Sequence, residues 1–354
     1  MVRILGDMLE GGGQIIRTSI ALSALTGEEV EIVNVRGKRS PPGLKAQHVT
    51  GIRAVAAISE AEVEGLEVGS MRLRFKPRTR GGGAFTFNVG TAGSISLVLQ
   101  ALMPAAAFAP KPLEAKITGG TDVKWSPTID YIRMVTLPIL AKMGYKAELK
   151  VERRGHYPRG GGQVAFKAYP IEKLNPITLE ERGTVIKIDG RSHCVRLPSH
   201  VAERQAEAAS RLLRNAGFEK VNVELESYPP ESDHHLGPGS GITLYAPTST
   251  GTIIGADAIG EKGKPAEKVG EEAASKLLAD LKTGMALDRH MGDMIIPYIA
   301  VADGKSEITV SQLTLHTMTN IKVTEAITGA QFKVQGELGK PARIEVNGIG
   351  LTPT

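Results

Sequence analysis

An eight-residue stretch near the N-terminus, Glu10-Gly11-Gly12-Gly13-Gln14-Ile15-Ile16-Arg17, combines three glycines with one acidic and one basic side chain. Glycines have no Cβ, so the backbone N–H groups of such a turn can approach an anion closely. Apolar residues at helical spacing follow, which places the turn at a helix N-terminus, where free N–H groups and the helix dipole favour phosphate. Arg17, about one turn into that helix, has a planar guanidinium suited to phosphate oxygens.

Glu10 is the residue that does not suit a simple phosphate turn. A carboxylate repels a neighbouring phosphate unless a metal ion lies between the two. The octet therefore predicts a metal-assisted phosphate site with Glu10 as the metal ligand. A tight turn followed by a surface arginine accounts equally well for these eight residues taken alone.

His316 is a second candidate, at the start of a predicted helix over 316–328 that follows a predicted strand over 307–310. From a strand-to-helix junction an imidazole can point into a cleft. The helix N-terminus disfavours the imidazolium form, so the ring would remain neutral and nucleophilic. The alternative is a partly buried structural histidine, because the chain has eight histidines and only its setting distinguishes this one.

Two further segments could hold an anion or a nucleotide. The segment Asp288-Arg289-His290-Met291-Gly292-Asp293 leads into an apolar helix, for which Asp293 is predicted to be the N-cap. The loop from Arg36 to Gly43 is basic and stiffened by two prolines, so it loses little entropy on ordering around an anion. The adjacent pair His234-His235 is not predicted to bind metal, and Gly160-Gly161-Gly162 is interpreted as a hairpin turn.

Composition limits the class of protein. The chain has 354 residues, with 41% hydrophobic and 23% charged residues, which is typical of a globular protein of two or three domains. No segment is apolar over the length of a membrane span, and no signal peptide is apparent, so we expect a cytoplasmic protein without a membrane partner. A single cysteine, Cys194, excludes an internal disulfide.

Positive charge is in slight excess and is clustered. Lysine and arginine number 43 against 38 acidic residues, a net charge of +5. The run from Arg72 to Arg80 alternates as one solvated face of a strand would, and we interpret it so. Aromatic residues make up only 4%, so any nucleic acid is expected to be held by phosphate and sugar rather than by extensive base stacking.

A recurring pattern organises the chain: a glycine-rich turn, an amphipathic helix and a short β-branched strand. Copies are predicted over 11–35, 90–118, 127–151 and 293–310, with partner helices at 47–59 and 316–328. The stretch 184–280 differs, with strands at 185–189, 221–226, 242–245 and 251–256 and helices at 200–216 and 264–281. We therefore expect a domain of repeated α+β units, formed by 1–183 and 281–354, with a small α+β domain inserted at 184–280.

Six segments in this order resemble the RNA 3′-terminal phosphate cyclase family over nearly the whole chain. They are Glu10-Gly-Gly-Gly-Gln-x-x-Arg17, Arg36-x-x-Arg39-x-x-Pro-Gly-Leu-x-x-Gln47-His48, Gly93-Ser94 with Leu97-Val98-Leu99-Gln100, Gly119-Gly120-Thr121-Asp122, His156-Tyr157-Pro158-x-Gly-Gly-Gly, and His316-x-x-Thr319-Asn320-Ile321. The resemblance implies repeated βαβαββ units similar to the C-terminal domain of a translation initiation factor, plus one inserted α+β domain.

The resemblance also implies a reaction. ATP adenylates a histidine and releases pyrophosphate; the AMP moves to an RNA 3′-phosphate; the neighbouring 2′-hydroxyl then attacks, giving a 2′,3′-cyclic phosphate and AMP. By position His316 would be the nucleophile and Glu10 the ligand of a divalent cation, Mg²⁺ or Mn²⁺. The other implied roles are phosphate binding and catalysis by Arg17, Arg36, Arg39, Gln47 and His48, and ATP binding by Gln100, Pro127, His290, Met291, Gly292, Asp293 and Met294.

Two positions depart from the family pattern. The family usually has Ala-Asp-Gln where this chain has Gly292-Asp293-Met294, and a cysteine or small residue where it has Leu315.

Two alternatives to a cyclase are a cyclase-like protein of ribosome assembly that binds RNA without catalysis, and an enolpyruvyl transferase. His316 together with Glu10 and the arginines argues against both. The implied partners are ATP and RNA with a 3′-phosphate end, and homo-oligomerisation is left open.

Overall fold

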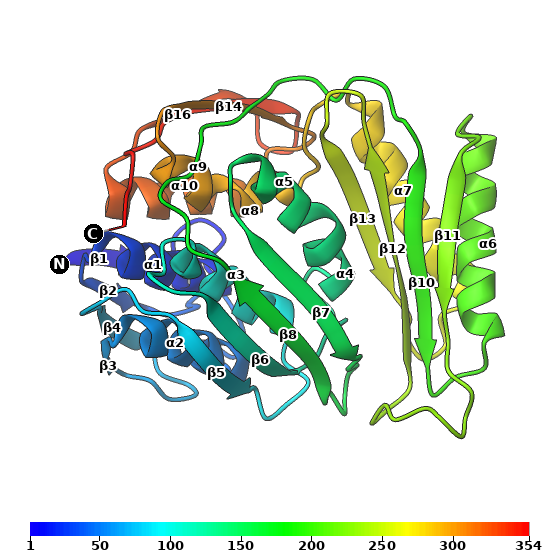
Figure 1. Cartoon of the computed structure of the whole chain (residues 1–354), viewed down its shortest axis with the longest axis horizontal. Helices are drawn as coiled ribbons and strands as arrows, with labels where there is room; N and C mark the ends of the chain where they lie inside the picture. The colour runs from blue at the N-terminus through cyan, green and yellow to red at the C-terminus, as the bar shows by residue number, and fades with distance from the viewer. Residues whose placement is uncertain (354) are drawn as a thin grey trace.

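The strands of residues 1–353, the part of the chain that the computed structural model describes, form four sheets of four strands each (Figure 1). The first sheet has the order β1-β2-β4-β3, in which the first pair is parallel and the others are antiparallel. Its elements are β1 (Val2–Leu5), α1 (Gly13–Thr26), β2 (Val30–Val33), α2 (Ala46–Ser59), β3 (Glu62–Glu64) and β4 (Arg72–Lys76).

The second sheet repeats this arrangement, with the order β5-β6-β8-β7 and one parallel pair, β5 with β6. Its elements are β5 (Gly83–Asn88), α3 (Ile95–Ala106), β6 (Leu113–Gly119), α4 (Ile129–Tyr131), the π-helix η1 (Ile132–Thr136), α5 (Leu137–Lys142), β7 (Ala147–Arg153) and β8 (Gly162–Ala168). The turn predicted at Gly160–Gly162 lies between the antiparallel strands β7 and β8.

The third sheet has the order β9-β14-β16-β15, again with its first pair parallel. Its elements are β9 (Thr178–Leu179), α8 (Met291–Met294), α9 (Ile296–Val301), β14 (Lys305–Val310), α10 (Leu315–Thr328), β15 (Phe332–Gly336) and β16 (Ala342–Asn347). The expectation of several α+β units, each a small sheet with helices, is confirmed. Their likeness to a translation-factor domain stays a prediction.

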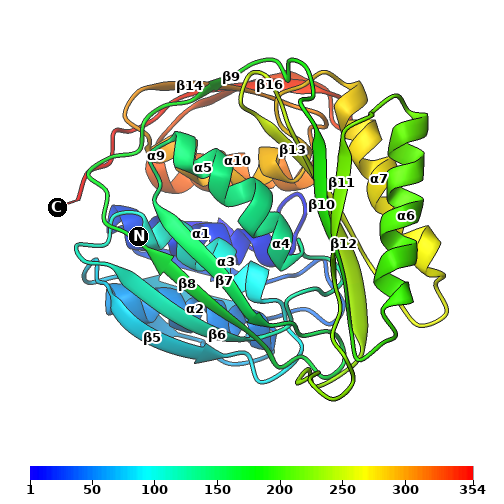
Figure 2. The ribbon, with the colours of Figure 1, turned by 45° about the vertical axis from the view of Figure 1, so that its right-hand side comes forward.

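Residues between β9 and α8 form the fourth sheet, with order β11-β10-β12-β13. Two long helices cover its outer face, at the right of Figures 1 and 2, and its other face is turned toward α4. Its elements are β10 (Ile188–Val195), α6 (His200–Asn215), β11 (Val221–Glu226), β12 (Gly239–Pro247), β13 (Ile253–Ile259) and α7 (Ala266–Lys282). We call this segment the inserted unit and the remainder the body.

Two hydrophobic cores correspond to the body and the inserted unit. One contains side chains of all three body sheets and their helices, and the other is made of residues 188–281. Helix α1 is buried on nearly every side, as its run of apolar and small residues requires. It ends at Gly27, whose φ of 78° is the left-handed conformation that favours glycine.

Some predicted boundaries are wrong for identifiable reasons. The strand expected at 185–189 is β10 at Ile188–Val195, because its polar residues Ser192 and His193 are buried. The single helix expected from Pro127 to Gly144 begins at Ile129 and contains η1. Pro138 has no N–H to offer the preceding turn, and the Leu137 N–H instead bonds the Ile132 carbonyl, five residues back.

The arginines of the 72–80 run lie on a solvated face, as expected. Arg72 pairs with Glu31, Arg74 with Glu29 and Glu64, and Arg78 with Glu62. These ion pairs are partly exposed, so each contributes little to stability. Among the described residues, none of the helices has the length and apolar character needed to cross a membrane.

We predict opposite effects on stability for two Gly→Ala substitutions in helices. A Cβ at Gly270 in α7 would overlap the Gln205 backbone carbonyl of α6, whereas at Gly51 in α2 the nearest side-chain atom, Cβ of Ala101, is 3.7 Å away. Gly270→Ala should therefore lower the free energy of unfolding by about 1–3 kcal/mol. Gly51→Ala should leave it unchanged or raise it by up to about 1 kcal/mol. Urea denaturation measures both, and equal effects would contradict the packing described for α6 and α7.

Candidate active site

A narrow pocket lies where α1, α3, α8, α9 and α10 meet in the body. These helices belong to different units, so the pocket exists only in the assembled body (Figure 2). It is lined by Gln14, Arg17, Thr18, Gln100, Met103, Pro104, Thr136, Asp293, Met294, Pro297, Tyr298 and Asn320. The pocket therefore brings together four residues predicted for one site: Arg17, Gln100, Asp293 and Met294.

The glycine turn at the start of α1 is closely packed by side chains. The Gly12 N–H donates to Oε2 of Glu10 at 2.7 Å, so the acidic residue itself occupies an N–H group of the helix N-terminus. A Cβ on Gly12 would overlap the Glu10 carboxylate, and one on Gly13 would overlap the His48 imidazole. Glycine is required here to let Glu10 and His48 approach the backbone, in addition to any approach of an anion.

Glu10 is buried and lies between the turn and two cationic or ionisable side chains. Its Oε1 pairs with Arg39 and is 3.9 Å from Nδ1 of His316. The Glu10 backbone N–H donates to Oγ1 of Thr319 on α10 at 3.2 Å, which ties the turn to the helix that carries His316. The structure thus places Glu10, Arg39 and His316 together, although they are far apart in the sequence.

Arg17 lies partly buried at the same pocket. Its Nε donates to Oε1 of Gln100 at 3.1 Å. Burial lowers the pKa of Arg17 to about 10, against the raising effect of Asp293 and Glu10, so the guanidinium stays charged at neutral pH. A charged guanidinium with its remaining N–H groups at a pocket is suited to phosphate oxygens.

Asp293 organises a chain of side-chain amides. Its Oδ1 accepts hydrogen bonds from the Gln14 side-chain amide and from Nδ2 of Asn320, the latter at 2.6 Å. Oδ1 of Asn320 in turn accepts a hydrogen bond from Thr18 at 2.5 Å. Burial raises the pKa of Asp293, while His316, Gln14 and Arg17 act in the opposite direction.

This arrangement determines which nitrogen of His316 carries the proton. An ionised carboxylate only accepts hydrogen bonds, so Gln14 directs its NH₂ group to Asp293 and its carbonyl oxygen to His316. That oxygen is 2.5 Å from Nδ1 of His316, which must donate. A neutral imidazole has one N–H, so Nε2 keeps its lone pair. The His316 side chain is 49% exposed, which leaves Nε2 accessible to a reactant.

Asp293 is not the N-cap predicted from the sequence; it lies inside α8 and its side chain bonds Gln14 and Asn320. Asp288 supports the start of this helix instead, since its Oδ1 accepts from the N–H groups of His290 and Met291, both at 2.9 Å. Both aspartates are capping residue types, and the sequence alone did not distinguish them. Because Asp288 caps the helix, the Asp293 side chain is free to bond residues of the pocket.

Comparison with known proteins assigns the chain. Residues 8–334 match the family described as RNA 3′-terminal phosphate cyclase. Among relatives bearing the same name, that of Ignicoccus hospitalis is 51% identical over 350 residues, covering 99% of both chains. Those of Hyperthermus butylicus and Desulfurococcus amylolyticus are 52% and 50% identical, over at least 99% of each chain.

The chain belongs to the RNA 3′-terminal phosphate cyclase family.

Arg36, Gln47 and His48, which the family resemblance also implicates in phosphate binding, are not among the residues that line the pocket within residues 1–353. Arg36 donates from one nitrogen to the carbonyls of Pro41 and Gly43, at 3.0 and 2.8 Å, and so holds the 36–43 loop. Oε1 of Gln47 accepts from the Ser94 N–H at 3.0 Å. His48 accepts from the Lys45 N–H at 3.0 Å, and burial lowers its pKa to about 3, so the ring is neutral.

Four residues predicted to bind the nucleotide are not among those lining the pocket within residues 1–353: Pro127, His290, Met291 and Gly292. Met291 and Gly292 are buried, and a Cβ on Gly292 would contact Val310. The exposed His290 ring packs edge-on against Tyr131, with ring centroids 6.1 Å apart. Pro127 precedes Thr128, which donates to Asp257 of the inserted unit at 2.8 Å.

Sequence reasoning assigned no role to several residues of this family's pocket. Gln14 and Asn320 stand inside two of the motifs that carried the family resemblance, so a signal was present in their positions. Met103, Pro104, Pro297 and Tyr298 come from helix interiors, where apolar residues are expected in any core. Of the two departures from the family pattern, Met294 lines the pocket, with Sδ 3.9 Å from Oγ1 of Thr136, and Leu315 begins α10 and is partly exposed.

We predict that His316 is held as the tautomer protonated at Nδ1. In ¹⁵N NMR spectra at neutral pH, Nε2 should have the shift of an unprotonated nitrogen. Gln14→Met removes the acceptor and should produce a mixture of tautomers.

The matched control is Gln100→Met, which removes another pocket amide that bonds Arg17 rather than His316. That variant should keep the parent tautomer. A parent spectrum with a protonated Nε2 would contradict the hydrogen-bond directions deduced from Asp293.

Proposed function

We propose that this protein converts an RNA 3′-terminal phosphate to a 2′,3′-cyclic phosphodiester at the cost of ATP, through a covalent histidine–AMP intermediate. One observation carries the proposal: in a chain of the cyclase family, His316 has its Nδ1 bonded to Gln14 and its Nε2 free at an accessible position. That is the arrangement a nucleophilic imidazole needs.

The reaction divides into three phosphoryl transfers. Nε2 of His316 attacks the α-phosphorus of ATP, the bond to the β-phosphate oxygen breaks, and pyrophosphate leaves. An oxygen of the RNA 3′-phosphate then attacks the same phosphorus, the N–P bond breaks, and the imidazole is restored. Finally the 2′-hydroxyl attacks the 3′-phosphorus, loses its proton and displaces AMP. Covalent catalysis thereby replaces one difficult condensation with easier steps.

Gln14 and Asp293 support the first step through His316. When Nε2 acquires a phosphoryl group, the imidazole carries positive charge, and the Nδ1–H bond to Gln14 strengthens as that charge develops. The Asp293 carboxylate acts through the Gln14 amide to stabilise the same charge. The pair therefore orients the nucleophile and stabilises the adenylated ring.

Glu10 is the residue we propose for a divalent cation, Mg²⁺ or Mn²⁺. A single buried carboxylate beside a phosphate site suits an ion that takes its other ligands from phosphates and water. Both carboxylate oxygens have protein partners here, Arg39 and the Gly12 N–H, so a cation would compete with Arg39 for Oε1. When bound, the cation would neutralise phosphate charge.

The phosphates are proposed to lie among Arg17, Arg39, Arg36, Gln47 and His48. Arg39, with a half-exposed side chain, is the residue of this group that can leave its partner and reach a substrate. The guanidinium groups would stabilise the negative charge spread over the transferring phosphoryl group. His48 contributes as a neutral hydrogen-bonding group, since its pKa is about 3.

Adenine is proposed to enter the pocket beside Gln100, Asp293 and Met294. The pocket has a volume of about 30 Å³, room for one or two water molecules. Entry of a purine therefore requires side chains to move, and the walls contain Met103 and Met294, whose unbranched side chains change rotamer readily. Pro127, His290, Met291 and Gly292 remain proposed ATP-binding residues at the opened pocket.

The wider setting follows from the same proposal. The partners would be ATP and RNA ending in a 3′-phosphate. The protein would act in the cytoplasm, and assembly into a homo-oligomer stays open. We also propose that the three units of the body are of the translation-initiation-factor type, supported by their shared strand order. A non-catalytic RNA-binding role in ribosome assembly is the alternative, and the retained nucleophile His316 with its supporting residues disfavours it.

We predict that incubation with radiolabelled ATP and Mg²⁺ or Mn²⁺ yields a protein–AMP adduct that is labile in acid and stable in alkali, as expected for a phosphoramidate. His316→Ala should abolish the adduct and the cyclisation of a 3′-phosphorylated oligoribonucleotide. His200→Ala, at an exposed position on α6, is the control and should retain both. An undiminished adduct in His316→Ala would reject His316 as the nucleophile, and GTP in place of ATP tests the nucleotide preference.

We predict that Arg39→Ala lowers kcat/KM for cyclisation by about 100-fold, because a donor to the phosphate is lost. Its free energy of unfolding should change by less than about 1 kcal/mol, since the Arg39 side chain is half-exposed. Arg78→Ala is the control: it removes an exposed ion pair with Glu62 just after β4 and should leave cyclisation unchanged. If Arg39→Ala instead unfolds the protein, the residue is structural.

A further inference from the structure

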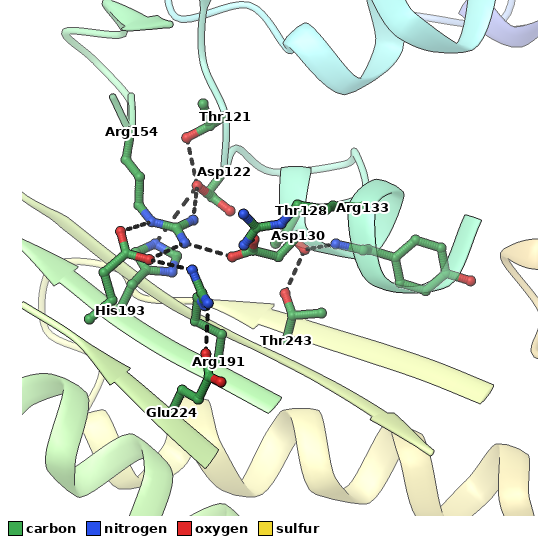
Figure 3. A network of polar contacts seen from close by, with 12 residues as sticks. Thr121, Asp122, Thr128, Asp130, Arg133, Arg154, Arg191, His193, Glu224 and Thr243 are labelled. Atoms are coloured by element: carbon green, nitrogen blue, oxygen red, sulfur yellow. Dashed lines mark hydrogen bonds and ion pairs between the residues drawn. The ribbon is translucent and has the colours of Figure 1, made fainter. Parts of the chain in front are cut away.

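Two motifs of the sequence have no part in the proposed reaction, Gly119–Asp122 and His156–Gly162. They meet at the junction of the body with the inserted unit, where Asp122 follows β6 and His156 lies in the loop between β7 and β8. His193, on β10 of the inserted unit, completes a buried group with Asp122 and His156. Figure 3 shows Asp122 and His193 within the surrounding polar network. Two of the side chains come from the body and one from the inserted unit, so they meet only when the inserted unit is docked.

The three side chains present ligand atoms at short separations. Nε2 of His156 and Nε2 of His193 are 3.0 Å apart, and Oδ2 of Asp122 is 3.9 Å from the first and 3.7 Å from the second. A triangle with these sides has a point about 2.1 Å from every corner, which is the length of a Zn–N or Zn–O bond. A single ion can therefore contact all three atoms with little movement.

The three ligand atoms have protein partners that an ion would replace or share: the two Nε2 atoms lie at hydrogen-bond distance from each other, and Oδ2 of Asp122 accepts from Thr121 at 2.6 Å and from Arg154 at 3.3 Å. Two other polar atoms of the same side chains are not satisfied. Oδ1 of Asp122 and Nδ1 of His156 are buried, and neither has a hydrogen-bond partner within residues 1–353. Buried polar atoms without partners are rare in folded proteins and often indicate an ion or water at the site.

Strand β12 is shaped to hold the two rings. A Cβ on Gly239 would overlap the His156 imidazole, and one on Gly241 would lie 2.9 Å from Cε1 of His193. Glycine at both positions leaves the space that the imidazoles fill.

The charges around the group tolerate a cation. Arg154 is buried against Asp122, Asp130 and Glu226, while Arg133 pairs with Asp130 and Arg191 pairs with Glu226 and Glu224. The carboxylates of this network, most of them visible in Figure 3, outnumber the guanidinium groups by one. A divalent ion at the histidines would therefore face no net positive charge from its surroundings.

We propose that Asp122, His156 and His193 bind a divalent transition-metal ion, best matched to Zn²⁺, which joins the inserted unit to the body. Two imidazoles and one carboxylate form a ligand set that zinc prefers, whereas Mg²⁺ prefers oxygen ligands alone. Because two ligands come from the body and one from the inserted unit, the coordination bonds would hold the two parts in one arrangement. The site is separate from Glu10 and does not depend on the proposed reaction.

The test is zinc binding to the full-length protein, prepared without a metal-affinity tag and stripped with a chelator. Competition with a chromophoric chelator should show that one Zn²⁺ ion binds tightly per protein chain. Co²⁺ bound in place of zinc should give the visible absorption bands of a low-coordinate site. His193→Ala and Asp122→Asn should each weaken zinc binding by about 100-fold or more. Added zinc should raise the Tm of the parent protein and not that of these variants.

Two controls separate this site from others. His235→Ala removes a buried histidine that bonds Asp233 outside the triad, and it should retain tight zinc binding. Glu10→Gln removes the cation ligand of the proposed active site and should retain it as well. Circular dichroism verifies that each variant is folded. If His193→Ala fails to fold, Asp122→Asn, whose side chain is nearly identical in shape to the parent's, provides the test. Absence of tight zinc in the parent, or equal binding in the triad variants, would overturn the proposal.

Discussion

The pocket depends on one constraint: Asp293 can only accept hydrogen bonds. This partly buried carboxylate fixes the orientation of two amides, Gln14 and Asn320, and the Gln14 carbonyl then fixes the tautomer of His316. Because these residues come from α1, α8 and α10, the hydrogen bonds to the Asp293 carboxylate also connect the three helices. With the Gln14 carbonyl facing Nδ1, Nε2 is the nitrogen of His316 that keeps its lone pair.

Glu10 imposes a second constraint, because both of its oxygens already have protein partners. The Gly12 N–H and Arg39 occupy them, and Nδ1 of His316 lies within 4 Å. A divalent cation at Glu10, as proposed, would compete with Arg39 for Oε1. Such competition would release the Arg39 guanidinium toward a phosphate when a cation arrives. The glycines permit this arrangement by letting the carboxylate lie directly against the turn.

Much of the fold follows from local sequence, and much of the site does not. Helix α1 and strand β11 are where the apolar spacing places them, although α1 is buried on nearly every side rather than on one face. The bounds of strand β10 were missed because its polar residues are buried by tertiary packing, which the sequence does not show. The π-helix η1 was missed because it arises from the missing N–H of a proline in the backbone. The predicted link between Glu10 and His316 came from family resemblance. The relay through Gln14 could not be predicted, because it arises from side-chain geometry between distant helices.

The junction with the inserted unit bears on the same pocket. Arg154 is fully buried with three carboxylates, a type of interaction that contributes little net stability but makes any other docking geometry costly, because it would leave a buried charge unpaired. One of those carboxylates, Asp130, lies in α4, and the helical segment that continues through η1 brings Thr136 to the pocket wall beside Met294. A single stiff segment thus spans from the charged junction to the pocket. Docking of the inserted unit therefore sets the position of one wall of the site, although the unit itself supplies none of the residues that line it in the described chain.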